Sequence, residues 1–234
     1  MWTETDLCRQ CAKNASEVVP LQARSEQTFT AVWSALRAWL VALFAKCRGG
    51  SIPNFARFAW HHAGVAADGS FTLRPSFVLS DAYVRSHQLN SGSGVLRMSH
   101  VAELELEPCE DFNALRVALK HSQSLTKDIV YSCSRQLLQQ LGQALRSGQP
   151  VSVNMGVGVL SGHNRTVSFA FKPTYLVHAP AHGPTPHSSA ATAQSGALAQ
   201  ERSSRPQQLP SHAASAHVGA GAGNEDVARE GSFG

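Results

Sequence analysis

The sequence has no hydrophobic run long enough to cross a membrane. Its most apolar stretch, 31–45, is interrupted by Arg37 and is shorter than the roughly 20 apolar residues that a spanning helix needs. The N-terminus opens with Glu4 and Asp6, where a secretory signal would carry basic residues followed by an apolar segment. These absences predict a protein of the cytoplasm, the cytoskeleton or the nucleus, with no membrane partner.

Cysteine is scarce and irregularly spaced. The chain has 5 cysteines, an odd number, which argues for a reducing compartment. Cys8 and Cys11 have the spacing of half a zinc site, but no second pair follows at the spacing that a four-ligand site requires. We interpret both as residues on or near one face of a helix, and we predict no metal site.

Recognisable catalytic motifs are missing too. No serine, cysteine or carboxylate stands in a nucleophile context. Gly156 and Gly158 suggest a phosphate-binding loop, yet they fall within a strand pattern and no Lys-Ser or Lys-Thr pair follows them. Glycines in a strand more often let a backbone or a partner approach closely. The sequence therefore predicts a non-enzyme without a cofactor or a small-molecule substrate.

Aromatic residues are nearly absent from the last part of the chain. Phe233 is the only one in 177–234, which is dominated by Ala, Ser, Gly, Pro, His and Gln. Such a segment cannot bury enough apolar surface to offset its ordering entropy, so we predict a disordered tail. The net charge of the whole chain is +4. This mildly basic balance permits an acidic partner, such as nucleic acid or a tubulin-like surface, but demands neither.

What the sequence does contain is an internal repeat of short helix, long helix, glycine stop and hairpin. Apolar residues at helical spacing mark the long helices, and alternation marks the strands. Ser124 or Thr126 is expected to cap the second long helix. The first repeat predicts helices at 3–14 and 26–46, strands near 52–60 and 71–79, and a short helix at 80–86; the second predicts helices at 112–121 and 125–146 and strands at 151–160 and 167–171.

The repeat resembles the bacterial HU/IHF fold and, most closely, the eukaryotic tandem HU-domain family that includes coiled-coil domain-containing protein eighty-one. The resemblance covers 2–175. Ala56 departs from the family pattern, which commonly has glycine there, and Pro173 predicts loss of the closing helix of the second unit. The matching stretches are GSIPNFARF at 50–58 and RPSF at 74–77 in the first unit, and VNMGVGVL at 153–160 and VSFAF at 167–171 in the second.

The resemblance implies an α+β protein with two tandem HU/IHF-like helix-helix-hairpin domains, at 1–90 and 91–176, and a disordered C-terminal tail at 177–234. Bacterial members dimerise and bend DNA with long basic arms that carry an apolar wedge. The eukaryotic tandem family is associated instead with centrosomes and with the axonemal microtubule wall of cilia. The sequence alone allows the two units to pair within one chain or between chains.

The hairpin tips bear on the choice between these two functions. The hairpin between Trp60 and Phe71 is short, and its tip at 66–69 carries an acid and no base. The second tip, at 162–165, has one arginine. Because phosphate neutralisation supplies most non-specific DNA affinity, these tips offer little for DNA binding.

We therefore predict a non-enzymatic structural protein of a ciliary or flagellar axonemal doublet microtubule, of the microtubule inner protein type, or of a centrosome. The expected partners are the tubulin lattice and other axonemal or centrosomal proteins. The alternatives are an HU-like architectural nucleic-acid-binding protein and a general protein-interaction adaptor.

A small set of side chains is singled out as possible partner contacts. His61 and His62 occupy adjacent strand positions, so they point to opposite faces and cannot easily hold one metal. The large aromatic residues of the first repeat are expected in the core, but Trp39 sits at the edge of its helix's apolar face. Three arginines would serve a nucleic-acid partner. The full set of possible contacts is Trp39, Arg57, His61, His62, Arg74 and Arg85.

Overall fold

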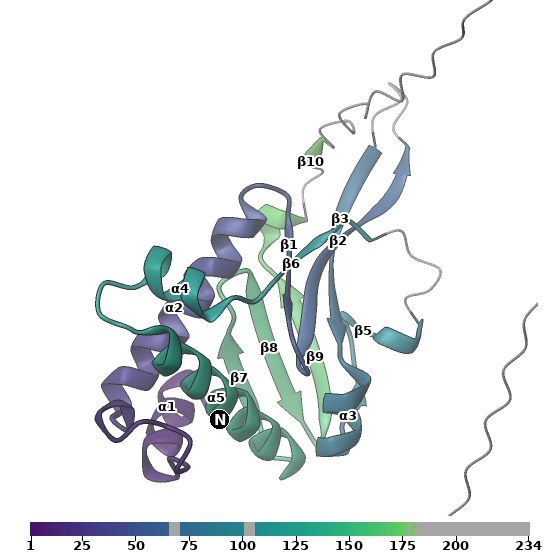
Figure 1. Cartoon of the computed structure of the whole chain (residues 1–234). Coiled ribbons are helices and arrows are strands. Elements are labelled where there is room, and N and C mark those ends of the chain that lie inside the picture. The colour runs from purple at the N-terminus through teal and green to yellow at the C-terminus, as the bar shows by residue number, and fades with distance from the viewer. Residues whose placement is uncertain (66–70, 101–105, 177–178, 181–234) are drawn as a thin grey trace, which may run out of the picture. The chain divides into compact units, whose positions relative to one another are not determined.

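The computed structural model describes residues 1–65, 71–100, 106–176 and 179–180 (Figure 1). They belong to one compact unit that spans Met1–Pro186. Helices and strands alternate in blocks along this unit, which confirms the α+β class expected from the sequence. None of the helices in the described ranges is both long and apolar enough to cross a membrane.

Two helices open the first repeat: α1 (Glu4–Lys13) and α2 (Glu26–Phe44), joined by a loop with the 3-10 turn η1 (Leu21–Ala23). Apolar residues at helical spacing bury one face of each helix. Ser25 caps α2, because its hydroxyl accepts a hydrogen bond from the backbone N of Thr28 at 3.1 Å. The helices predicted at 3–14 and 26–46 are confirmed, with ends that differ by the ordinary scatter of helix boundaries.

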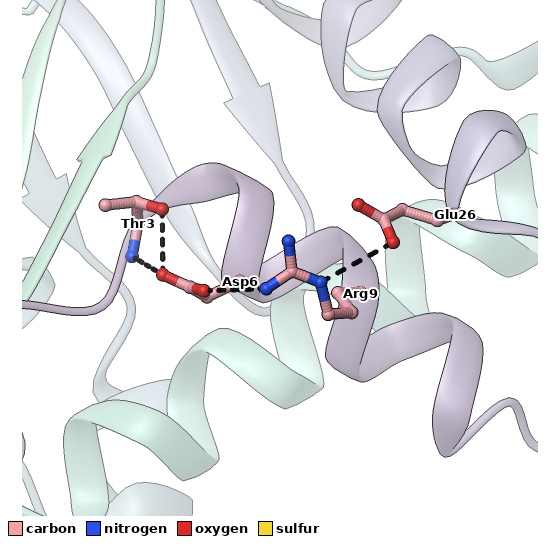
Figure 2. A network of polar contacts seen from close by, with 4 residues as sticks. All are labelled: Thr3, Asp6, Arg9 and Glu26. Carbon is pink, nitrogen blue, oxygen red and sulfur yellow. Dashed lines mark hydrogen bonds and ion pairs between the residues drawn. The ribbon is translucent and has the colours of Figure 1, made fainter.

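A polar network fixes the first turn of α1 and ties it to α2 (Figure 2). The backbone N and the hydroxyl of Thr3 each donate a hydrogen bond to Asp6 Oδ2 at 2.9 Å. Arg9 Nη1 lies 3.3 Å from Asp6 Oδ1, and its Nε lies 3.7 Å from Glu26 Oε2. Thr3 and Asp6 thus form a local helix start, and Arg9 links that start to the first turn of α2.

Three antiparallel strands follow α2: β1 (Gly49–Ile52), β2 (Ala56–Val65) and β3 (Phe71–Leu79). The sequence predicted one strand across 52–60, and this is wrong in detail. The chain turns between β1 and β2, where Asn54 has a φ of 60°. Asparagine tolerates this left-handed conformation better than most residues, so the turn has a local cause. The predicted hairpin tip at 66–69 lies outside the described residues.

The segment after β3 connects the two repeats. It contains α3 (Asp81–His87), β4 (Asn90–Ser91), β5 (Val95–Arg97), the 3-10 turn η2 (Met98–His100) and β6 (Cys109–Asp111). The short helix predicted at 80–86 is therefore confirmed as α3. The first sheet has the order β10-β3-β2-β1-β6, in which β10 is Ala179–Pro180, and β5 also pairs with β3.

The second repeat contains α4 (Ala114–His121), α5 (Lys127–Arg146), β7 (Val151–Asn154), β8 (Gly158–His163) and β9 (Thr166–Phe171). Thr126 provides the cap of α5, accepting a hydrogen bond from the backbone N of Ile129 at 3.4 Å. Among the described residues, the 3-10 turn η3 (Pro173–Tyr175) and the strand β10 follow β9, and no α-helix does, where the first repeat has α3. The predicted loss of a closing helix after β9 holds for these residues.

The helices of the two repeats pack reciprocally. α1 of the first repeat packs against α5, α4 of the second packs against α2, and α2 and α5 pack against each other. Leu36 and Leu40 of α2, with Leu137 and Leu141 of α5, are at most 1% exposed and belong to one hydrophobic cluster that includes residues of both repeats. The two units therefore pair within one chain, which the sequence alone left undecided.

The outer edges of the second sheet are covered by segments of the first repeat. Along β7, the backbone N of Trp2 donates to Pro150 O at 2.7 Å, and Ser152 N donates to Trp2 O at 2.8 Å. Along β9, Asn90 N of β4 donates to Arg165 O at 2.8 Å. Covered edges do not offer backbone groups to another chain, so this sheet is protected from edge-to-edge association.

The two hairpins differ in length, which the sequence analysis did not anticipate. β2 and β3 have 10 and 9 residues, whereas β8 and β9 have 6 each. A register shift between His62 and Gly64 interrupts the longer hairpin. The shorter hairpin closes through Asn164 and Arg165, whose φ angles of 48° and 64° are those of a tight two-residue turn. The tail predicted at 177–234 lies outside the described residues, apart from β10.

Candidate docking surfaces

Three of the predicted contact residues lie together on the outer face of the first sheet. Phe58 and Trp60 of β2 are buried in the core, so the alternating residues Arg57 and His61 point to the opposite face. Arg74 of β3 is the direct cross-strand partner of His61 and shares that face. Arg57 and Arg74 are exposed. This outer sheet face thus presents two accessible guanidinium groups.

His61 itself adds no charge to this face at neutral pH. Its Nδ1 lies 2.6 Å from the hydroxyl of Ser76 on β3. Burial of the ring, together with the nearby charge of Arg74, lowers the pKa of His61 below its ordinary value. The imidazole is therefore neutral at pH 7 and acts as a hydrogen-bonding group within the sheet.

His62 points the other way, as predicted from its strand position. Its Nε2 lies 2.8 Å from Glu107 Oε1. Glu107 is held in place because its backbone N donates to Trp60 O at 2.8 Å, and Leu106 pairs with His61. Within the described residues, no group of three or more His, Cys, Asp and Glu side chains is placed to hold a metal ion.

Trp39 is a correction to the predicted contact set. Its side chain is 2% exposed and packs edge-on against Phe112, with ring centroids 5.6 Å apart. It belongs to the core because the segment before α4 covers the edge of α2 on which it lies. Arg85 is exposed on α3 and is not a residue of the sheet. The other large aromatic residues of the first repeat are core residues as predicted: Trp33, Phe44, Phe58 and Trp60.

The cysteine pair of α1 is buried. Cys8 is 2% exposed and Cys11 is fully buried, on the face of α1 that packs against the other helices. Burial raises the pKa of both thiols. Both residues therefore behave as small apolar core residues, in agreement with their interpretation as helix-face cysteines.

A second surface, which the sequence did not reveal, is a groove where the two repeats meet. Its volume is about 510 Å³. The β1–β2 turn contributes Pro53 and Asn54, α3 contributes His87, and α5 forms the opposite wall. We call it the inter-repeat groove, and its lining residues on α5 are Tyr131, Ser134, Arg135, Leu138 and Gln139.

The inter-repeat groove is lined by neutral polar side chains and one arginine. Arg135 is exposed, and its guanidinium carbon lies 5.7 Å from the ring centroid of Tyr131, one helical turn away. Ser134 is 3% exposed, and its hydroxyl has no hydrogen-bond partner within the described residues. Burial and Arg146 lower the pKa of His87. No Asp or Glu is among the described residues that line the groove.

Only a weak sequence signal pointed to this groove. Tyr131 and Arg135 stand four residues apart on the long helix of the second repeat, at positions that do not belong to its apolar face. The rest of the lining comes from 52–55, from three residues of α3 and from Phe112 and Ala114. The first two of these segments lie far from α5 in the sequence. Helical spacing predicts that a residue is exposed, but not which distant turn will lie beside it.

Two family models match the chain, one in each repeat. Residues 11–91 match the family model of the CCDC81 eukaryotic HU domain 1. Residues 108–179 match the family model of the CCDC81 eukaryotic HU domain 2. The two matches stand in tandem and in family order, which confirms the resemblance inferred from the sequence. A comparison with curated proteins finds no match.

Proposed function

Because the chain belongs to the family of tandem eukaryotic HU domains described for CCDC81, we propose that it is a non-enzymatic structural protein that docks onto other proteins. Its proposed place is a ciliary or flagellar axonemal doublet microtubule, or a centrosome. The proposed partners are the tubulin lattice and neighbouring axonemal or centrosomal proteins.

The observation that carries this proposal is the form of the hairpins. Bacterial HU and IHF need long basic arms to bend DNA. The second hairpin here closes through a two-residue turn at Asn164 and Arg165, directly after the six-residue strand β8. The described part of the first hairpin carries Arg57 and Arg74, next to a neutral His61. Few phosphate contacts are available from such hairpins, and non-specific DNA affinity depends on their number.

Pairing of the two repeats within the chain also supports a docking role. The reciprocal packing of α1 on α5 and of α4 on α2 fills the surface through which single HU units would associate. The edges of the second sheet are covered as well. Arg57 and Arg74 on the outer sheet face and the inter-repeat groove remain accessible, and both suit contact with another protein.

A nucleic-acid-binding architectural role is the second candidate, and one observation favours it. The first hairpin is longer than the second, and its outer face presents the exposed Arg57 and Arg74. This role predicts steeply salt-dependent binding to duplex DNA that weakens when Arg57, Arg74 and Arg85 are changed to glutamine. Absence of duplex binding at low salt would remove it.

The two candidates are separated by localising a tagged full-length chain in ciliated cells. The docking proposal predicts signal along axonemes or at centrosomes, and density for the paired repeats on purified doublet microtubules. Exclusive nuclear signal, together with salt-dependent duplex binding in vitro, would contradict the docking proposal and support the architectural one.

A further inference from the structure

We infer that the inter-repeat groove binds a peptide segment of a protein partner that combines a carboxylate with an apolar side chain. The inference rests on the proposed docking function and specifies the surface that performs it. It assigns the groove to residues of α5, α3 and the β1–β2 turn, so that the site exists only when both repeats are paired.

The cation of the groove has no carboxylate partner among the described residues. Arg135 forms no ion pair there, and its guanidinium carbon lies 5.7 Å from the centroid of the Tyr131 ring. The guanidinium carbon lies over the Tyr131 ring, and this contact reduces the conformational entropy that the arginine loses on binding. Arginine forms paired hydrogen bonds with a carboxylate, so this arrangement favours an acidic residue of the partner.

The hydroxyl of Ser134 is a second, independent observation that favours a ligand with a hydrogen-bond acceptor. It is buried in the groove wall next to Arg135 and has no hydrogen-bond partner in the described part of the chain. Buried polar groups without partners are rare, and each needs an explanation. A carboxylate or a backbone carbonyl in the groove would accept a hydrogen bond from Ser134 beside the charge of Arg135.

Apolar side chains also line the groove or lie next to residues that do. Phe112 and Ala114 line the groove at the start of α4. Next to Ala114, α4 exposes Leu115 at 48% and Leu119 at 74%, one helical turn apart. A single cation beside apolar side chains fits a peptide better than duplex DNA, which needs many phosphate contacts along a charged surface.

The two repeats differ in how the turn between their first two strands packs against the long helix of the other repeat. In the second repeat the β7–β8 turn lies directly on α2, where a Cβ at Gly156 would stand 2.9 Å from Arg37 O. In the first repeat the corresponding β1–β2 turn, with Pro53 and Asn54, leaves the groove open beside α5. The same junction is thus closed on one side of the molecule and open on the other, so the groove is not a feature that the repeat requires.

The inference is tested with the full-length chain and a fluorescein-labelled peptide that alternates Glu with Leu and Phe, read by fluorescence anisotropy. A second peptide with Gln in place of every Glu is the ligand control. We expect the Glu peptide to bind more tightly than the Gln peptide. Arg135→Gln should weaken binding of the Glu peptide about tenfold, the usual effect of losing a charge-assisted hydrogen bond. Ser134→Ala should weaken it by a smaller factor.

The matched control variant is Lys13→Gln, which also removes one exposed positive charge, from the last turn of α1. It should bind the Glu peptide like the unchanged chain, and thermal unfolding should show that all variants are folded. Equal binding by the unchanged chain and Arg135→Gln would overturn the inference. So would failure to bind the Glu peptide, or duplex DNA binding that Arg135→Gln abolishes in its place.

The peptide assay and the localisation of the tagged chain can fail independently, so together they test the groove assignment and the proposed function separately. If the peptide fails to bind while the tagged chain reaches axonemes or centrosomes, the groove assignment is wrong and the docking role stands. If the peptide binds as expected while the tagged chain is exclusively nuclear, the groove stands and its partner lies elsewhere.

Discussion

Phe77 and Phe169 stack face to face, with ring centroids 4.4 Å apart and ring planes 14° apart. They occupy corresponding places in the two repeats. Phe77 is the cross-strand partner of Phe58 between β3 and β2, and Phe169 is that of Leu160 between β9 and β8. The two sheets therefore meet through equivalent residues, as expected if the repeats pair like the two subunits of a dimer.

The stack should couple the stability of the two repeats. Replacing Phe169 by alanine removes a side chain that is 5% exposed and leaves a cavity against Phe77, which should destabilise the chain by about 3–5 kcal/mol. Urea unfolding gives the value. Val159→Ala, on the outer face of β8, is the control and should cost at most about 0.5 kcal/mol. An effect of Phe169→Ala on the second repeat alone would contradict coupled repeats.

The helices were predictable because their signal is local. Leu36 and Leu40 in α2, and Leu137 and Leu141 in α5, repeat at helical spacing and are buried where the period places them. The order of helices and hairpins followed from the same patterns. The split of the first strand was missed because the turn at Asn54 interrupts a run of apolar residues that otherwise resembles one strand.

The candidate surfaces were predictable only in part, and for the same reason. Strand alternation correctly placed His61 and His62 on opposite faces. The burial of Trp39 depends on Phe112, and the inter-repeat groove depends on α3 lying beside α5. These contacts join segments far apart in the sequence. No local period encodes them, so they became visible only in the folded chain.

Gly158 should be intolerant of a side chain. A Cβ there would stand 2.5 Å from Ala170 O, a backbone atom that cannot move without shifting β9. Gly158→Ala should therefore destabilise the chain by about 1–3 kcal/mol, as overpacking does. Ser161→Ala, at an exposed position of the same strand, should be nearly neutral. Equal unfolding midpoints for the two variants would show that β8 and β9 are not packed as described.

Asp6 should contribute stability that depends on pH. The hydrogen bond from Thr3 N, then that from the Thr3 hydroxyl, and the charge of Arg9 lower the pKa of Asp6 in the folded chain. A lowered folded pKa means that the stabilisation is present above the unfolded value of about 4 and is lost as the pH falls through the folded value.

The variant Asp6→Asn tests this dependence. It should lower the melting temperature at neutral pH and should match the unchanged chain in strong acid, where Asp6 is protonated in both states. Glu17→Gln, at an exposed loop position, is the control. A deficit of Asp6→Asn that is the same at both pH values would show that the network in Figure 2 does not act through the carboxylate charge.

The cysteines should differ in reactivity. Burial raises the pKa of Cys133 to about 11 and also raises those of Cys8 and Cys11, so few of these thiols are ionised near pH 8. Cys47 is only partly buried. Limited alkylation followed by peptide mass mapping should find Cys47 modified before these three. In denaturant all should react alike, and early modification of Cys133 in the native chain would contradict its placement.

The pairing of the two repeats within one chain is tested most directly by following their unfolding separately in one sample. Hydrogen exchange of the α2 and β2 amides reports on the first repeat. Hydrogen exchange of the α5 and β8 amides reports on the second. The account predicts a monomer by light scattering, in which both signals give the same free energy of unfolding and the same urea dependence. Two separate transitions, or a dimer in which the repeats pair between chains, would contradict it.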